Sequence, residues 1–513
     1  MSNMIYTRQQ ISLIEDNSEK CGVSRLQLME NAGKAAFETV MSLYGDGICR
    51  AAVLCGSGNN GGDGLVTARL FAENGIDTTV ILVCGKMKTD SAKIMFEKLK
   101  NVKVIDYSEE KDNAVSSVLS ADIIIDAIFG TGFHGEVRGN AAELISDISD
   151  LRDRVVSLDL PSGADCDSGA VSNVCVKAKL TVSFIAKKPC HILYPAADYC
   201  GEVKTVDISV PDEAYIKENI HIINENDIKP YFSKNRPIMC NKYDFGRALL
   251  ICGSYGMAGA AAIAAHAAVK CGTGLVSVCL PKSIYGIVSA NLSEAVFQPF
   301  EENEKGRLSA KNCPEISKCV KKESAVLIGC GMGCDNDTKS VVSAVVSSAD
   351  CPIIIDADGI NCIASNIDIL REAKSPVILT PHMGEMSRLC GLTVNQIESD
   401  ILNVGSAFSG DKNVILVLKG PRTLIFTPDG DIYINTLADS GMATAGTGDM
   451  LSGMTVSFLA QGIDAVRSAC CAVYLHGKSG IMAAKSHSRR AMTPTDMTNC
   501  LESLFLQYET ECD

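Results

Sequence analysis

Residues 51–64 read Ala51-Ala52-Val53-Leu54-Cys55-Gly56-Ser57-Gly58-Asn59-Asn60-Gly61-Gly62-Asp63-Gly64, and the fold class can be predicted from them. The first five residues form a short apolar run, as in a buried strand. Glycines crowd the next nine, and a helix-like segment follows at residues 65–74. Strand, glycine-rich loop and helix in this order open a βαβ unit. The stretch therefore predicts a parallel sheet covered by helices on both faces.

The same alternation continues through the first half and begins again in the second. Helices are expected within residues 1–50, at 91–99 and at 259–271, where Gly272 follows as a stop. Between the halves, prolines at 211, 230 and 237 lie among polar residues, as in an interdomain connection. We predict two α/β domains, residues 1–215 and residues 225–513. The expected strands are residues 51–55, 79–84, 123–126, 155–159, 180–185, 248–252, 275–280, 325–328, 353–356, 377–380 and 414–418.

Composition limits the class of protein. The 513 residues carry a net charge of −14, which argues against nucleic acid as a routine partner. No segment has the length and apolarity of a membrane span, and the first residues have no apolar signal core. The 23 cysteines form no C-x-x-C pair, and many lie in apolar strand-like runs. A reduced, cytoplasmic protein without a disulfide scaffold or zinc site is expected.

Polar residues and glycines follow three strands of the first half. The expected strands end near Cys55, at Asp126 and at Asp159, and each leads into a glycine-containing loop. Open α/β sheets place ligands at these strand ends. Each loop alone could be a tight turn, but three together offer amides for a pyrophosphate and oxygen ligands for a hard cation. The glycine loop is not G-x-G-x-x-G, so a hydride-transfer dehydrogenase fits poorly.

These loops resemble those of the NAD(P)H-hydrate epimerase domain, over about residues 10–210. That family implies a Rossmann-like fold that interconverts the R and S hydrates at C6 of the nicotinamide ring. The resemblance implies a potassium site at Asn60, Asp126 and Ser162, and oxygen atoms suit such an ion. We expect Asp159 to be the acid/base, and His134 to be a loop residue rather than a catalyst. The implied substrate contacts are Asn59, Asn60, Gly61, Gly62, Asp63, Gly130, Thr131, Gly132, Phe133, His134, Gly135, Glu136 and Asp159.

A second glycine-rich stretch, Gly441-Met442-Ala443-Thr444-Ala445-Gly446-Thr447-Gly448-Asp449, runs into an apolar helical segment. Unpaired amides and the macrodipole at a helix N-terminus favour an anion. Asp449 could simply cap the helix. A carboxylate beside a phosphate-sized concavity also suits proton transfer from a hydroxyl that is being phosphorylated.

Other loops after strands of the second half carry candidate ligands. Lys419 beside Gly420 is either a phosphate contact or a solvated residue at a strand end. His382 is either a buried turn residue or a ligand contact. Together with Phe245-Gly246-Arg247, residues 329–333 and Gly446-Thr447-Gly448-Asp449, these loops resemble ribokinase-like proteins, and more closely the ADP- or ATP-dependent NAD(P)H-hydrate dehydratase, over about residues 225–505.

The resemblance implies hydrate contacts at Ala260, Gly331, His382 and Asp449, and a homo-oligomer. The nucleotide contacts expected are Lys419, Gly420, Pro421, Arg422, Thr423, Gly446, Thr447 and Gly448. Two departures occur, because Asn241-Lys242-Tyr243 stands where the family often has His-Lys-Gly, and Gly359 replaces a larger apolar residue. The first departure puts in doubt any contact made by the missing histidine.

Both domains in one chain match the bifunctional nicotinamide-nucleotide repair family. The implied substrates are NADH hydrate and NADPH hydrate, with Mg²⁺ and either ADP or ATP in the second domain and K⁺ in the first. Asp449 would assist phosphoryl transfer to the C6 hydroxyl, and loss of phosphate would restore the dihydronicotinamide. Two alternatives remain at this stage: a small-molecule kinase acting on a vitamin alcohol, and a non-catalytic nucleotide-binding protein.

Overall fold

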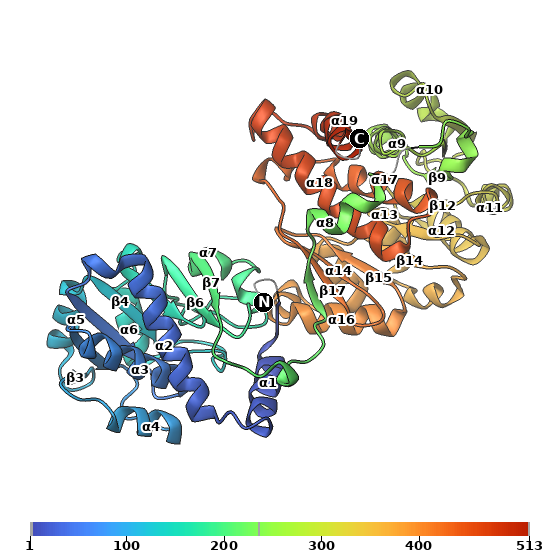
Figure 1. The fold of residues 1–513 in the computed structure, drawn as a ribbon. Helices are drawn as coiled ribbons and strands as arrows, with labels where there is room; N and C mark the ends of the chain where they lie inside the picture. Colours follow the sequence, from blue (N-terminus) through green and yellow to red (C-terminus); the bar gives the residue numbers. More distant parts are fainter. Residues whose placement is uncertain (1–3, 234–235, 511–513) are drawn as a thin grey trace. The chain divides into compact units, whose positions relative to one another are not determined.

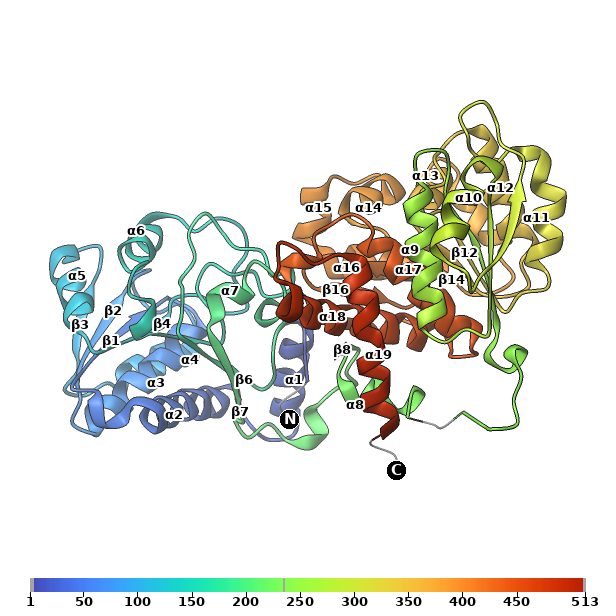
Figure 2. The same cartoon turned by 90° about the horizontal axis from the view of Figure 1, so that it is seen from above.

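The computed structural model describes residues 4–233 and 236–510. Contacts divide the chain into two compact units, Met1–Ile220 with Glu398–Asp400 and His221–Ile397 with Ile401–Asp513. Within the described residues, no helix combines the length and apolarity needed to cross a bilayer. Figures 1 and 2 show that each unit is built around a sheet with helices on both sides.

The first unit contains a seven-stranded, wholly parallel sheet in the order β3-β2-β1-β4-β5-β6-β7. Its strands are β1 (Arg50–Cys55), β2 (Asp77–Leu82), β3 (Lys103–Asp106), β4 (Ile123–Ala127), β5 (Val155–Leu158), β6 (Leu180–Phe184) and β7 (Glu202–Val206). Its helices are α1 (Arg8–Lys20), α2 (Arg25–Tyr44), α3 (Asn59–Glu73), α4 (Asp90–Glu97), α5 (Lys111–Ser120), α6 (Gly139–Asp147) and α7 (Ala197–Cys200).

Alternate side chains of the central strands enter two separate cores. Val53 and Ile125 pack with α2 and α3, whereas Leu54 and Ile124 pack with α5 and α6. Figure 2 shows these two helix pairs on opposite faces of the sheet. The predicted parallel sheet with both faces covered is confirmed.

The glycine-rich segment after β1 differs from the prediction. It was expected as a loop through Gly64, but α3 already begins at Asn59. The glycines allow the helix to approach the sheet closely: a Cβ on Gly61 would lie 2.0 Å from the Gly56 carbonyl oxygen, and one on Gly64 would lie 2.6 Å from the Ala127 Cβ. Close packing at the first turns of α3 therefore explains the glycine pattern.

The second unit contains a ten-stranded sheet in the order β11-β10-β9-β12-β13-β14-β15-β16-β17-β8. Pairing is parallel from β11 to β15 and antiparallel from β15 through β17. The strands are β8 (Ile220–Ile222), β9 (Arg247–Ile251), β10 (Leu275–Pro281), β11 (Val296–Phe300), β12 (Ala325–Ile328), β13 (Ile353–Ile355), β14 (Val377–Leu379), β15 (Ile415–Leu418), β16 (Thr423–Phe426) and β17 (Ile432–Asn435).

Helices cover both faces of this sheet. Figure 1 shows α17, α18 and α19 on one side and α14 and α16 on the other. The helices are α8 (Glu225–Ile228), α9 (Ala258–Lys270), α10 (Lys282–Asn291), α11 (Cys313–Val320), α12 (Asn336–Ser348), α13 (Asp358–Ile363), α14 (Met383–Cys390), α15 (Val394–Ser399), α16 (Ile401–Lys412), α17 (Thr447–Ala460), α18 (Ala465–His487) and α19 (Pro494–Thr510).

The proline-containing region at 211–245 is not wholly a connection. Its middle forms β8, the edge strand beside β17, and the Ile223 amide donates a hydrogen bond to the Ile434 carbonyl at 3.0 Å. Ile220 and Ile223 are buried. Burial of these two isoleucines explains why a mostly polar segment joins the sheet.

Gly453 of α17 packs directly against the backbone of α9. A Cβ at this position would lie 2.1 Å from the Ala264 carbonyl oxygen. We expect Gly453→Ala to destabilise the second unit by about 1–3 kcal/mol, since backbone must move to relieve the overlap. Gly259→Ala on α9 is the matched control, because a Cβ there meets nothing within 4 Å. Equal denaturation midpoints for the two variants would contradict this account.

Candidate active sites

A cavity of about 660 Å³ lies in the first unit, beside the carboxyl ends of its central strands. Parallel pairing places the ends of β1, β4 and β5 in neighbouring positions, as predicted. The lining includes the predicted residues Asn59, Asn60, Asp63, Gly130, Thr131, Gly132, Phe133, His134 and Asp159. It also includes residues that no motif indicated, among them Glu15, Arg25 and Lys188.

Asp159 is held by an unusual backbone and a buried cation. Its φ of +67° lies in the left-handed region, which residues other than glycine rarely adopt. The fully buried Lys188 forms an ion pair with Asp159 Oδ1. The same ammonium donates hydrogen bonds to the Phe184 carbonyl at 2.8 Å and to Ser183 Oγ at 3.1 Å. The Asp159 carboxylate is therefore oriented by a fixed positive charge.

His191 secures the same segment. The Lys188 amide donates to His191 Nδ1 at 3.0 Å, so the proton is on Nε2, which donates to the Asp159 carbonyl at 2.8 Å. Burial, reinforced by the nearby lysine, lowers the pKa of His191 to about 3. His191 is thus a neutral structural partner of Asp159.

Two further carboxyl groups line this cavity. Burial raises the pKa of Asp63 well above its ordinary value, and the negative charges of Asp159 and Glu15 raise it further. Burial also raises the pKa of Glu15, with Arg25 opposing the shift. The cavity therefore combines an ion-paired carboxylate with a carboxyl group that favours its neutral form.

The residues expected to bind potassium are buried, and one of them, Asn60, also lines the cavity. Asp126 Oδ2 accepts hydrogen bonds from Ser157 Oγ at 2.7 Å and from the Ser162 amide at 2.9 Å, and Oδ1 accepts one from Ser162 Oγ at 2.5 Å. Asn60 Nδ2 donates to the Phe129 carbonyl at 2.8 Å, but the buried Asn60 Oδ1 has no hydrogen-bond partner. An orphaned amide oxygen within an oxygen-only donor set fits a hard monovalent cation.

The other predicted contacts of the first unit lie outside the cavity lining. Gly61 and Gly62 are buried in the first turns of α3. Gly135 and Glu136 follow the lining loop. His134, by contrast, lines the cavity, and its Nδ1 lies 2.8 Å from Asp165 Oδ2. That it is a loop residue rather than a catalyst stays a prediction.

Asp449 lies in the first turn of α17, which begins at Thr447 after Gly446 in the left-handed conformation (φ +93°). The predicted loop-to-helix junction is confirmed, although Asp449 is not the capping residue. Burial raises the pKa of Asp449 to about 6, and the negative charge of Asp356 adds to the shift. A carboxyl group that titrates near pH 6 can accept a proton from a bound hydroxyl near neutral pH.

Asp356 and Lys419 form an ion pair beside Asp449. Lys419 Nζ lies 2.8 Å from Asp356 Oδ1, and Ser452 Oγ donates to Asp356 Oδ2 at 2.7 Å. Burial opposes the charge of Asp356, but Lys419 holds the pKa of this carboxyl below its ordinary value. The interpretation of Lys419 as a solvated residue at a strand end is wrong, because only 20% of its side chain is exposed.

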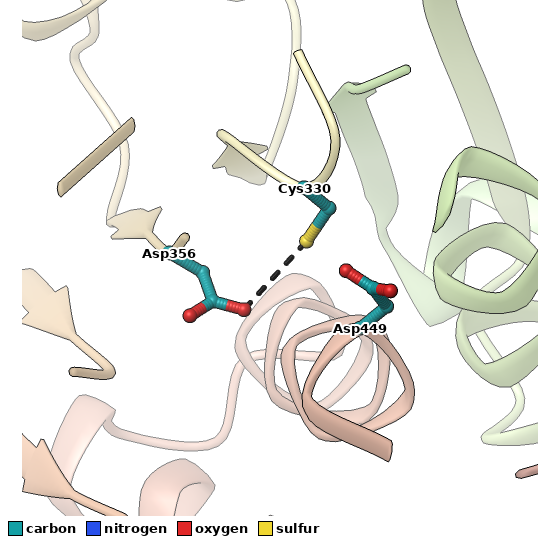
Figure 3. A group of neighbouring side chains, drawn as sticks. All are labelled: Cys330, Asp356 and Asp449. Atoms are coloured by element: carbon teal, nitrogen blue, oxygen red, sulfur yellow. Dashed lines mark hydrogen bonds between the residues drawn. The ribbon is translucent and has the colours of Figure 1, made fainter. Parts of the chain in front are cut away.

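Cys330 completes this group, and its thiol lies 3.7 Å from Asp356 Oδ2. Figure 3 shows the Cys330 sulfur and the Asp356 and Asp449 carboxyl groups directed toward one another. Both Asp356 oxygens already have hydrogen-bond donors, and sulfur is a poor ligand for Mg²⁺. The group is better described as a charged hydrogen-bond network than as a resident metal site.

The structure brings several predicted residues of the second unit together. A Cβ on Gly331 would lie 2.8 Å from the Ala260 Cβ, and one on Gly448 would lie 3.5 Å from Lys419 Nζ. His382 is not buried, since 56% of its side chain is exposed. It caps α14, with Nδ1 accepting a hydrogen bond from the Gly384 amide at 3.0 Å. Its backbone forms an isolated parallel β-bridge with Lys419.

The remaining predicted nucleotide contacts occupy the turn between β15 and β16 and the start of α17. Thr423 Oγ1 donates to the Gly420 carbonyl at 3.5 Å, and Arg422 donates to the Thr436 carbonyl. Thr447 Oγ1 donates to the Thr444 carbonyl at 2.8 Å. Pro421 lies in the same turn. The role of this turn in nucleotide binding stays a prediction.

Comparison with known proteins covers both units. Residues 248–503 match the family described as NAD(P)H-hydrate dehydratase, and residues 25–190 match the family described as YjeF-related protein N-terminus. The bifunctional NAD(P)H-hydrate repair enzyme Nnr of Moorella thermoacetica is 32% identical over 502 residues, covering 96% of this chain and 94% of the relative. The chain belongs to the bifunctional NAD(P)H-hydrate repair enzyme family.

Another member of this repair family, from Thermofilum pendens, is 34% identical over 499 residues, with 96% and 94% coverage. Among solved structures, a ribokinase-like superfamily protein of Enterococcus faecalis superposes with a TM-score of 0.51 at 26% identity. The match covers 57% of this chain and 98% of that chain. The predicted ribokinase-like fold is confirmed.

Proposed function

We propose that this chain repairs hydrated NADH and NADPH. Residues 1–215 interconvert the R and S hydrates at C6, and residues 225–513 dehydrate the S form at the expense of ADP or ATP. The proposal rests on the match to repair-enzyme relatives over nearly their whole length. Each unit of the chain also has a carboxyl group suited to acid/base chemistry, Asp159 in the first and Asp449 in the second.

In the second unit the nucleotide enters as its magnesium complex. Asp449 accepts the proton of the C6 hydroxyl while the phosphoryl group is transferred to that oxygen. The amides of Gly446, Thr447 and Gly448 face the charge of the moving group at the start of α17. Lys419, close to Gly448, supplies positive charge. Loss of phosphate, driven by the ring nitrogen, restores the dihydronicotinamide.

In the first unit Asp159 exchanges protons with the hydrate. Asn60, Asp126 and Ser162 would hold K⁺, which would supply positive charge to this site. The proposal includes the site residues named above and the potassium ion. It also includes a homo-oligomeric, cytoplasmic enzyme without nucleic-acid or membrane partners. The two alternatives from the sequence are not favoured. A vitamin-alcohol kinase leaves the first unit unexplained, and a non-catalytic nucleotide-binding protein gives Asp126, Asp159 and Asp449 no chemical role.

Absorbance at about 340 nm tests the function, with purified protein, both NADH-hydrate epimers, Mg²⁺, K⁺ and either ADP or ATP. Recovery of NADH from both epimers is the expected result. Recovery that stops at the S fraction would remove the epimerase assignment. No recovery with either nucleotide, and a stable phosphorylated product instead, would favour a kinase.

Potassium is tested by replacement. At about 100 times its dissociation constant, K⁺ should stabilise the first unit by about 2.7 kcal/mol. We therefore expect a lower unfolding temperature in choline chloride than in KCl of equal ionic strength. Asn60→Ala should abolish the difference, since it removes the orphaned oxygen. A difference that persists in Asn60→Ala would contradict this assignment.

A further inference from the structure

The Lys188 ammonium is committed to three acceptors. Asp159 Oδ1, the Phe184 carbonyl and Ser183 Oγ together use its three N–H bonds. Lys188 is also fully buried. It therefore has one position, and only Asp159 among its three acceptors carries charge. Holding a lysine in such a place is costly unless its charge is paired.

Asp63 shares the cavity with Asp159 and Lys188, but the ion pair of Lys188 is with Asp159. Within the described residues, its carboxyl group makes no ion pair or side-chain hydrogen bond, and Glu15 and Asp159 line the same cavity. Burial and these two negative charges raise the pKa of Asp63 more than the charge of Lys188 lowers it, so the protonated form is favoured. One cavity thus contains a fixed carboxylate and a proton donor.

We propose that Asp63 and Asp159 act as a catalytic pair in the epimerisation, one donating and the other accepting a proton, and that Lys188 is the positioning residue that places the negative charge on Asp159. The inference rests on the proposed epimerase activity of the first unit and deepens it. Asp63 then does more than bind the hydrate.

In one direction, the proton moves from Asp63 to Asp159. Asp63 donates its proton to the C6 hydroxyl, the C6–O bond breaks and water leaves, while the N1 lone pair forms the N1=C6 bond of an iminium. Water adds to the other face of C6, its proton passes to Asp159, and the C=N electron pair returns to N1. The hydrate keeps its composition, and one proton has moved from Asp63 to Asp159.

The reverse conversion uses the same groups with their roles exchanged. Between turnovers in one direction, the proton returns to Asp63 through water in the cavity. Such a pair suits a reaction whose substrate and product differ only in the face of C6 that carries the hydroxyl. The oxygen of the product comes from solvent, which gives the proposal a direct isotopic test.

The test follows epimerisation of R NADH hydrate by the full-length chain in H₂¹⁸O and K⁺ without nucleotide, with chromatographic separation and mass measurement. Wild type should incorporate one ¹⁸O for each conversion. Asp63→Asn and Asp159→Asn should each lower the rate by about 10²–10⁴-fold. Retention of ¹⁶O, or a wild-type rate in Asp63→Asn, would overturn the pair.

Lys188→Met should lower the rate of epimerisation by about 10²-fold. The acidic limb of the pH profile of this rate should move to higher pH. The groups that face Asp159 are Lys188, Asp63, Glu15 and His191, and Arg25 opposes Glu15. Lys188→Arg should restore the profile in part. Lys187→Met, which removes the same charge one residue away, is the control and should behave as wild type.

Folding is monitored separately. Lys188→Met combined with Asp159→Asn leaves no unpaired charge, so it should recover unfolding temperature without recovering rate. An unchanged rate and pH profile in Lys188→Met would overturn the positioning role. Absence of epimerisation in wild type would instead refute the proposed function of the first unit.

Discussion

Asp449→Asn is expected to lower the rate of S-hydrate dehydration by about 10³-fold, since general-base catalysis contributes about 10²–10⁴-fold. The Asp449 carboxyl lies at the start of α17, beside the amides assigned to the phosphoryl group. Asparagine keeps the shape of this side chain but cannot accept the proton. Nucleotide binding should persist, because the Lys419 turn is untouched.

The pH dependence follows from the pKa of Asp449, which burial raises to about 6. The base form is required, so the wild-type rate should rise as pH increases through about 6. The residual rate of Asp449→Asn should lack this step. Absorbance at about 340 nm with ADP or ATP measures both profiles, and the exposed Asp429→Asn is the control. A variant that keeps more than a tenth of the rate would contradict the role.

The same shift predicts the effect on stability. The folded-state pKa lies above the unfolded value, so folding loses stability as pH rises from about 4 through 6. Asp449→Asn has no ionisable group at this position, so it does not lose this stability. It should therefore unfold at higher denaturant concentration than wild type at pH 7.5, and the difference should vanish below about pH 4. A destabilised variant at pH 7.5 would show that Asp449 serves packing rather than chemistry.

The central strands could be predicted from the sequence because they are continuous apolar runs. β4 and β12 are buried at every position. The edge strands β3 and β7 were missed because exposed polar residues, such as Lys103 and Glu202, interrupt their pattern. The β16–β17 hairpin was also missed, although Pro428-Asp429-Gly430 is a turn signal that could have revealed it.

The candidate sites were predictable where a motif carries the residue. Asp159 and Asp449 follow glycine-containing or strand-end sequences. Lys188 does not, and its contact with Asp159 joins residues 29 positions apart through the packing around β6. Ser452 reaches Asp356 across 96 positions. Such contacts depend on sheet order and helix placement, which local patterns do not encode.

Lys419→Met is expected to lower the free energy of unfolding of the second unit by about 3–5 kcal/mol, as when one partner of a buried ion pair is removed. Only 2% of the Asp356 side chain is exposed, so in the variant the Asp356 carboxylate would be unpaired and almost unsolvated. Nucleotide binding should weaken as well, because the ammonium lies near Gly448. Denaturant unfolding and nucleotide titration measure the two effects.

A second ion pair supplies the control for Lys419→Met. Lys374 lies 3.0 Å from Asp350, but more than half of each side chain is exposed, so Lys374→Met should cost at most about 1 kcal/mol. Lys419→Met combined with Asp356→Asn should recover most of the stability, since no unpaired charge remains. Equal losses for the two lysine variants would show that the Asp356 pair behaves as a surface contact.

The pH dependence separates charge from packing. Lys419 keeps the pKa of Asp356 below its ordinary value in the wild type, so this stability is present above the unfolded pKa and declines as pH falls through the folded one. Without Lys419, burial raises the pKa of Asp356 instead, and protonation relieves the unpaired charge. The gap between wild type and Lys419→Met should therefore narrow as pH falls toward 4. A gap that stays constant with pH would mean that the lysine stem, rather than its charge, stabilises this site.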